Sequence, residues 1–127
     1  MPGLDIITIN QEIFKKISEM DLIMKNIDNL SEEKANAIGN YEKAVSIALI
    51  RLSNGEQLSL DGKTIKDPKA AAIDKIARGV CSKEKIAAEL AEALYKNAIV
   101  KIETLRAEMN GFQSIGRYSQ EVDKWTR

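Results

Sequence analysis

The chain has 127 residues, with 19 Lys and Arg against 19 Asp and Glu, so its formal net charge is zero. Nucleic-acid-binding domains usually carry a basic excess, and this balance therefore disfavours that class. One cysteine cannot form an internal disulfide, and the lack of histidine removes the commonest metal ligand and general base. Aromatic residues make up only 5%, so the core must be aliphatic, which suits helix-on-helix packing.

The first helix is predicted to follow a short apolar arm, residues 1–9, which lacks the basic region of a signal peptide. Thr8 and Gln11 fit a capping box, in which side chains at both positions satisfy the free N–H groups at a helix start. Apolar residues then recur at steps of four and three, as in a heptad seam: Ile13, Ile17, Met20, Met24 and Ile27.

This periodicity slips at residues 28–33, where Ser31 could cap a second helix. We favour one long helix, with or without a kink near Asn29. Gly39 costs about 1 kcal/mol relative to Ala inside a helix, which predicts close packing or bending there. The helix should end at residues 53–55, Ser-Asn-Gly, because Asn and Gly readily adopt the left-handed conformation of a C-cap.

Residues 56–66 change to an alternating pattern around Asp61-Gly62, which predicts a short β-hairpin, with a plain loop as the alternative. Asp67 is expected to cap a helix over residues 69–77, with Pro68 at its first position. That helix should close near Gly79, and Ser82 should cap the next one; a helix continuing through Gly79 is the alternative.

The longest helical pattern covers residues 86–109, with Leu94, Ala98, Ile102, Leu105 and Met109 on one side. The following Asn-Gly pair predicts its end, leaving residues 112–127 as a C-terminal tail. We therefore expect a single all-α domain over residues 1–127, a long antiparallel helical hairpin or bundle with a short β-hairpin insertion. Two long helices bury their apolar sides poorly alone, which predicts a homo-oligomer, most simply a dimer with a four-helix core.

The sequence offers no catalytic constellation, metal site or cofactor motif, so we expect neither an enzyme nor a small-molecule substrate. No stretch reaches the ~18 apolar residues of a membrane span, which points by default to a cytoplasmic protein. Three of the six aromatic residues lie in the tail. The candidate partner-binding residues there are of types enriched at protein interfaces: Arg117, Tyr118, Lys124, Trp125 and Arg127.

Two alternatives to this tail site remain. The tail could fold back as a short helix that buries Trp125 at the edge of the core. Alternatively, Lys63, Lys66 and Lys69 near the hairpin could contact the phosphates of a nucleic acid.

The block LAEALYKNAIVKIETLRAEMNGFQSIGRYSQE resembles the C-terminal part of small helical proteins encoded in bacteriophage and prophage genomes. The segment YEKAVSIALIRLSNGEQ is similar to the middle helix of that group. The matching positions of the first block are Lys101, Ile102, Leu105, Arg106, Glu108, Gln113, Ser114 and Ile115. The resemblance implies an accessory protein that blocks a host protein or assists DNA metabolism, and it implies no catalytic residues.

Overall fold

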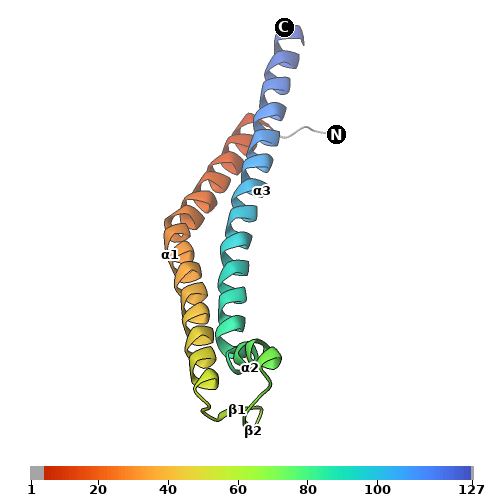
Figure 1. Ribbon diagram of the computed structural model, residues 1–127. Helices are drawn as coiled ribbons and strands as arrows, with labels where there is room; N and C mark the ends of the chain where they lie inside the picture. Colours follow the sequence, from red (N-terminus) through yellow and green to blue (C-terminus); the bar gives the residue numbers. More distant parts are fainter. Residues whose placement is uncertain (1–4, 127) are drawn as a thin grey trace. The chain divides into compact units, whose positions relative to one another are not determined.

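The computed structural model describes residues 5–126, and the side chains of all of these except Asp123 and Thr126. Two long helices dominate this part of the chain, α1 (Ile6–Ser53) and α3 (Ser82–Thr126) (Figure 1). Between them lie strand β1 (Leu58–Leu60), strand β2 (Lys63–Ile65), a 3-10 turn η1 (Ala70–Ala72) and helix α2 (Ile73–Val80). The all-α fold with a small hairpin insertion is confirmed.

The chain divides into two compact units. The first combines Met1–Asp28 with Lys96–Arg127, and the second is Asn29–Tyr95. Both long helices pass from one unit to the other, and in each unit a part of α1 packs against a part of α3 or α2. Helix α1 runs through Asn29 without a break, as predicted.

The start of α1 differs from the prediction, because the helix already begins at Ile6. Within the expected arm, residues 6–9 are therefore helical, and residues 1–4 lie outside the described residues. The cap is Asp5, whose carboxylate oxygen accepts a hydrogen bond from the Thr8 backbone N–H at 2.7 Å. This hydrogen bond is the main reason that the pKa of Asp5 lies below its usual value. The predicted Thr8–Gln11 capping box is therefore wrong, because the helix is capped three residues earlier than expected.

The end of α1 follows the prediction in detail. Gly55 has φ +80°, its N–H donates to the Leu52 carbonyl at 3.1 Å, and the Glu56 N–H donates to the Arg51 carbonyl at 3.0 Å. These two bonds form a Schellman motif, which satisfies carbonyls that the last helical turn leaves free. An ion pair between the side chains of Arg51 and Glu56, at 2.6 Å, spans the same junction.

The hairpin is also confirmed. Strands β1 and β2 are antiparallel, with Leu58 opposite Ile65 and Leu60 opposite Lys63. Asp61 and Gly62 both have positive φ, at +52° and +78°, as a type I′ turn requires. The hairpin rests on α2: a Cβ at Gly79 would lie 3.3 Å from a Leu60 methyl carbon, so a side chain at that position would press on the strand.

The expected cap at Asp67 is wrong. Asp67 has φ +45°, whereas an N-cap residue needs extended backbone. It lies in the irregular segment between β2 and η1. Regular α-helix begins only at Ile73 and extends one residue past Gly79. Cys81 then joins α2 to α3, because its N–H donates to the Ala77 carbonyl and its own carbonyl accepts from the Lys85 N–H. Ser82 is thus the first residue of α3 and not its cap.

The second unit contains the main core. Its fully buried members are small or aliphatic: Val45, Ala48, Leu52, Leu58, Ala77 and Cys81. Burial, and secondarily the negative charge of Glu84, raises the pKa of the Cys81 thiol.

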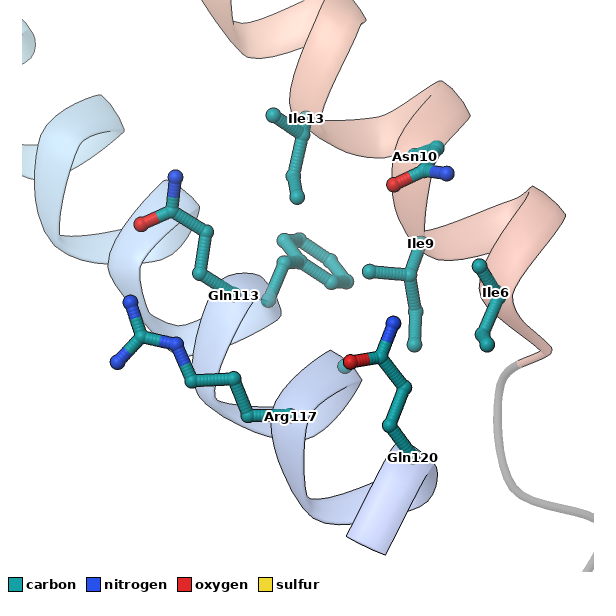
Figure 2. Close-up of a pocket in the computed structure, with 9 residues that line it drawn as sticks. Ile6, Ile9, Asn10, Ile13, Gln113, Arg117 and Gln120 are labelled. Atoms are coloured by element: carbon teal, nitrogen blue, oxygen red, sulfur yellow. The ribbon is translucent and has the colours of Figure 1, made fainter. Parts of the chain in front are cut away.

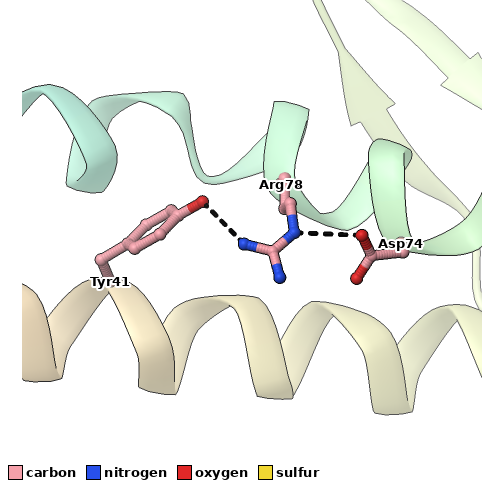
Figure 3. A network of polar contacts seen from close by, with 3 residues as sticks. All are labelled: Tyr41, Asp74 and Arg78. Carbon is pink, nitrogen blue, oxygen red and sulfur yellow. Dashed lines mark hydrogen bonds and ion pairs between the residues drawn. The ribbon is translucent and has the colours of Figure 1, made fainter.

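At the rim of this core, Arg78 on α2 donates hydrogen bonds to Asp74 at 3.0 Å and to the Tyr41 hydroxyl of α1 at 3.4 Å (Figure 3). These bonds, that with Tyr41 above all, raise the pKa of the Arg78 guanidinium.

In the first unit the predicted heptad seam is confirmed in part. Ile13, Met20 and Ile27 are half-buried, whereas Ile17 and Met24 are exposed and Lys16 and Ile23 are half-buried beside the seam. Lys16 forms an ion pair with Glu108 of α3, which is the main cause of its raised pKa, and its ammonium lies 5.8 Å from the Phe112 ring centre. Its aliphatic stem can therefore cover apolar surface while its charge is paired. The sequence pattern counted only apolar residues, and this is why the contribution of Lys16 was missed.

The predicted end of the long helix at Asn110-Gly111 is the largest error. Helix α3 continues through both residues to Thr126, so the expected separate tail is helical. Beyond this point Phe112 and Gly116 are half-buried on the side that faces α1, where Ile9 is buried and its methyl carbon lies 3.7 Å from a Cβ built at Gly116. Packing against α1 therefore outweighs the local preference of Asn-Gly for a helix end.

The core predicts a strong contrast between two residues of α1 that are two positions apart in the sequence. Leu52 is 3% exposed within the main core, whereas Ile50 is 61% exposed. We expect Leu52→Ala to lower the free energy of unfolding by about 2–5 kcal/mol, because it removes buried methyl groups and leaves a cavity. Ile50→Ala should change it by less than about 0.5 kcal/mol. Urea denaturation followed by circular dichroism measures both, and equal losses would contradict this core.

The Asp5 cap predicts a dependence on pH. Because the pKa of Asp5 is lowered in the folded chain, its stabilising contact is fully present above the unfolded value of about 3.9 and is lost as the pH falls through the folded pKa. The exchange rate and chemical shift of the Thr8 amide, measured by NMR, should follow this titration. Asp5→Asn keeps an acceptor but cannot titrate, so the same amide should then show no such step; an unchanged step in that variant would rule out Asp5 as the cap.

Candidate protein-interaction site

The C-terminal part of α3 has two faces. One faces α1 and includes Phe112 and Gly116. The other consists of residues that recur at steps of four, three, four and three along the helix, which keeps them on one side. We call this second face the C-terminal seam: Gly111, Ile115, Tyr118, Val122 and Trp125.

The C-terminal seam is exposed to an unusual degree for such residues. Tyr118 is 71% exposed and Trp125 is 89% exposed, and Ile115 and Val122 are also exposed. Tyr118, Val122 and Trp125, together with Glu121, line a shallow groove of about 350 Å³ along this face. The alternative in which Trp125 folds back into the core is therefore wrong, because Trp125 belongs to the continuous helix α3 and its side chain is exposed.

Helical geometry divides the predicted partner-binding residues into two groups. Tyr118 and Trp125 are seven residues apart and share the C-terminal seam. Arg117 and Lys124 are also seven residues apart and exposed, but each precedes a seam residue by one position, about 100° around the helix. Arg127 lies outside the described residues. The aromatic pair is therefore the centre of the candidate site, and the basic pair lies on the neighbouring face.

Gly111 belongs to this site and was missed, because it was interpreted as the end of the helix. It has ordinary helical backbone, and no atom lies within 4 Å of a Cβ built on it. A hollow of about 320 Å³ opens over it, lined by Lys16, Glu108, Gly111, Phe112 and Ile115. The continued spacing from Gly111 to Trp125 was the signal that could have revealed both the helix and the seam.

A second hollow of about 230 Å³ lies at the other side of the same unit, between the first turns of α1 and the C-terminal part of α3. Figure 2 shows Ile9 and Ile13 of α1 pointing toward α3, with the Gln120 amide beside Ile9, whereas the Arg117 guanidinium points away from α1. Its volume is below the roughly 300–1,000 Å³ of most small-molecule sites, so we assign it no ligand.

The three lysines of the alternative nucleic-acid site lie at and after the hairpin. Lys63 is in β2, and Lys66 and Lys69 lie between β2 and η1. All three are exposed, and none is within ion-pair distance of a carboxylate on a described residue. All three lysines therefore have the exposure that phosphate contacts would need. No aromatic residue lies beside them in the sequence.

In the part of the chain that the structure describes, no group of three or more His, Cys, Asp or Glu side chains is arranged to hold a metal ion. None of its helices combines the length and the apolar character needed to cross a bilayer.

Comparison of the chain with protein-family models, with curated protein sequences and with solved structures gave no match. The similarity to small phage proteins thus stays a prediction from the residues quoted above.

Proposed function

We propose that this chain is a non-enzymatic accessory protein, of the kind encoded by phages and prophages, that acts in the cytoplasm by binding protein. The C-terminal seam is its contact surface. The single observation that supports this proposal is the exposure of Tyr118 and Trp125 on one helix face at heptad spacing. Aromatic side chains of this size are costly to leave in water, and they are the residues most enriched at binding hot spots.

The mechanism follows from this surface. A helix of the partner that packs along the C-terminal seam would bury Ile115, Tyr118 and Trp125, since apolar residues at steps of three and four are the anchors of helix-to-helix recognition. Arg117 and Lys124 on the neighbouring face would lie at the rim of this contact. There they would favour acidic partners, and they would raise the rate of association more than the affinity. Such binding would let the protein block or modulate a host protein without any chemical step.

Photo-crosslinking tests the proposed function directly. We expect p-benzoyl-phenylalanine in place of Tyr118 to form a covalent adduct with a protein when the chain is irradiated in its host cells. Leu22 is a matched control, because it is similarly exposed, at 69% against 71%, but lies on α1 outside the C-terminal seam. The same substitution there should give little adduct. The absence of any protein adduct at position 118 would contradict the proposal.

A nucleic-acid-binding accessory factor is the second candidate, supported by the unpaired, exposed Lys63, Lys66 and Lys69. If it holds, filter binding to single- or double-stranded DNA should weaken steeply between low and high salt, because phosphate contacts release counterions. Replacing all three lysines by Ala should then reduce binding and flatten the salt dependence.

The matched control for this assay is the triple replacement of Lys15, Lys25 and Lys43 by Ala, which removes the same charge from exposed positions of α1. Equal losses in both triple variants would indicate only an effect of net charge. No DNA binding by the unmodified chain would exclude the second candidate and leave the first.

A further inference from the structure

No side chain of the described residues fills the hollow over Gly111. A glycine inside a helix loses more conformational freedom on folding than any other residue, so its presence usually reflects a turn, a positive φ or a close approach. Gly111 shows none of these, because its backbone is helical and nothing lies within 4 Å of the position of its missing Cβ. Packing among the described residues therefore does not require a glycine at this position.

Trp125 presents the complementary feature on the same face. It is the most exposed of the large apolar side chains that the structure describes, and it lies fourteen residues from Gly111, or about 21 Å along the helix. Tyr118 lies midway, seven residues from each. An antiparallel copy of the same helix, related by a two-fold axis at Tyr118, brings the largest side chain of each copy to the smallest residue of the other.

We propose that the C-terminal seam binds a second copy of this chain in antiparallel orientation, with Trp125 of each copy inserted into the hollow over Gly111 of the other. This inference rests on the proposed function and names its partner. The hollow suits an indole: Phe112 and Ile115 supply apolar contacts, the Lys16 ammonium can lie against the ring, and the Glu108 carboxylate can accept the indole N–H.

The area available agrees with a dimer. The chain exposes 9601 Å², whereas a monomeric protein of 14.1 kDa exposes about 6,700 Å². In the proposed dimer the four exposed aromatic rings alone would bury roughly 600 Å², and the aliphatic side chains beside them bring the total near the ~1,000 Å² that a specific interface needs. Residues 111–126 carry two basic and two acidic side chains, so two copies do not repel each other.

The experiment exploits the fact that Trp125 is the only tryptophan of the chain. In the full-length protein, sedimentation velocity should show a dimer whose population grows with concentration, and Trp125 fluorescence should shift to the blue in parallel as the ring leaves water. Gly111→Leu fills the hollow with a side chain whose Cβ meets no atom of a described residue within 4 Å. It should preserve helicity but weaken self-association by roughly tenfold or more, with Trp125 emission returning to that of an exposed ring.

Gly39→Leu is the matched control. Gly39 is also a helical glycine with nothing within 4 Å of a Cβ, but it lies in α1 within the second unit. This variant should associate as tightly as the unmodified chain. A chain that stays monomeric into the high micromolar range, or a Gly111→Leu variant that associates normally, would overturn the proposal.

Orientation is tested with two single variants, Ser114→Cys and Glu121→Cys, mixed under mild oxidation. In the antiparallel dimer position 121 of one copy lies within one residue of the point that faces position 114 of the other, so the mixed disulfide should predominate. Native Cys81 can stay in place, because its burial keeps the thiol protonated and slow to react. Predominance of either homodisulfide, or no disulfide at all, would overturn the antiparallel register.

The outcome also separates this inference from the proposed function. If the chain is monomeric while crosslinking at position 118 captures a different protein, the second copy is wrong and the interaction function stands. If no protein is captured and no dimer forms, both fail. Adducts of two identical chains at position 118, lost in Gly111→Leu and kept in Gly39→Leu, would support both.

Discussion

The constraint on which this structure depends is that α3 carries more apolar surface than α1 covers. In the first unit α1 buries one face of α3 through Ile9, Leu105 and Phe112, and it leaves the C-terminal seam exposed. Hydrophobic burial is the main favourable term in folding, and it acts without preferred direction, so exposed apolar residues on a rigid helix attract any complementary surface. The proposed interaction function would follow from this exposed surface alone.

The second unit illustrates how a chain with few aromatic residues still builds a core. Ala48 and Ala77 allow the backbones of α1 and α2 to approach closely, while Val45, Leu52 and Leu58 fill the remaining space. The polar contacts of this unit stay at the rim, as in the Tyr41–Arg78–Asp74 group, where their loss leaves no buried charge behind. The main core and the exposed C-terminal seam therefore lie in separate units.

Sequence reasoning succeeded where local backbone chemistry decides the outcome. The helix end at Gly55 and the turn at Asp61-Gly62 require positive φ, and residue type alone favours that conformation. It failed where contacts between residues far apart in the sequence decide the local structure. Asn110-Gly111 has the same local preference as Asn54-Gly55, but its helix continues because Phe112 and Gly116 pack against α1. The half-buried position of Lys16 likewise involves its ion pair with Glu108, which lies 92 residues further along the sequence. The aromatic residues of the candidate site were found from composition, whereas Gly111 and the hollow over it required the helix to be seen as continuous.

The segment that joins the two long helices has a further consequence. Among the described residues, every positive φ falls between residues 55 and 67, and two of these four positions, 61 and 67, are aspartates. An L-residue with a side chain pays a steric penalty in this conformation, which asparagine tolerates better, and Asn-Gly is the pair that a type I′ turn prefers most. This short reversal is therefore the natural region in which to engineer a more heat-resistant form, since changes there leave both long helices and their surfaces untouched.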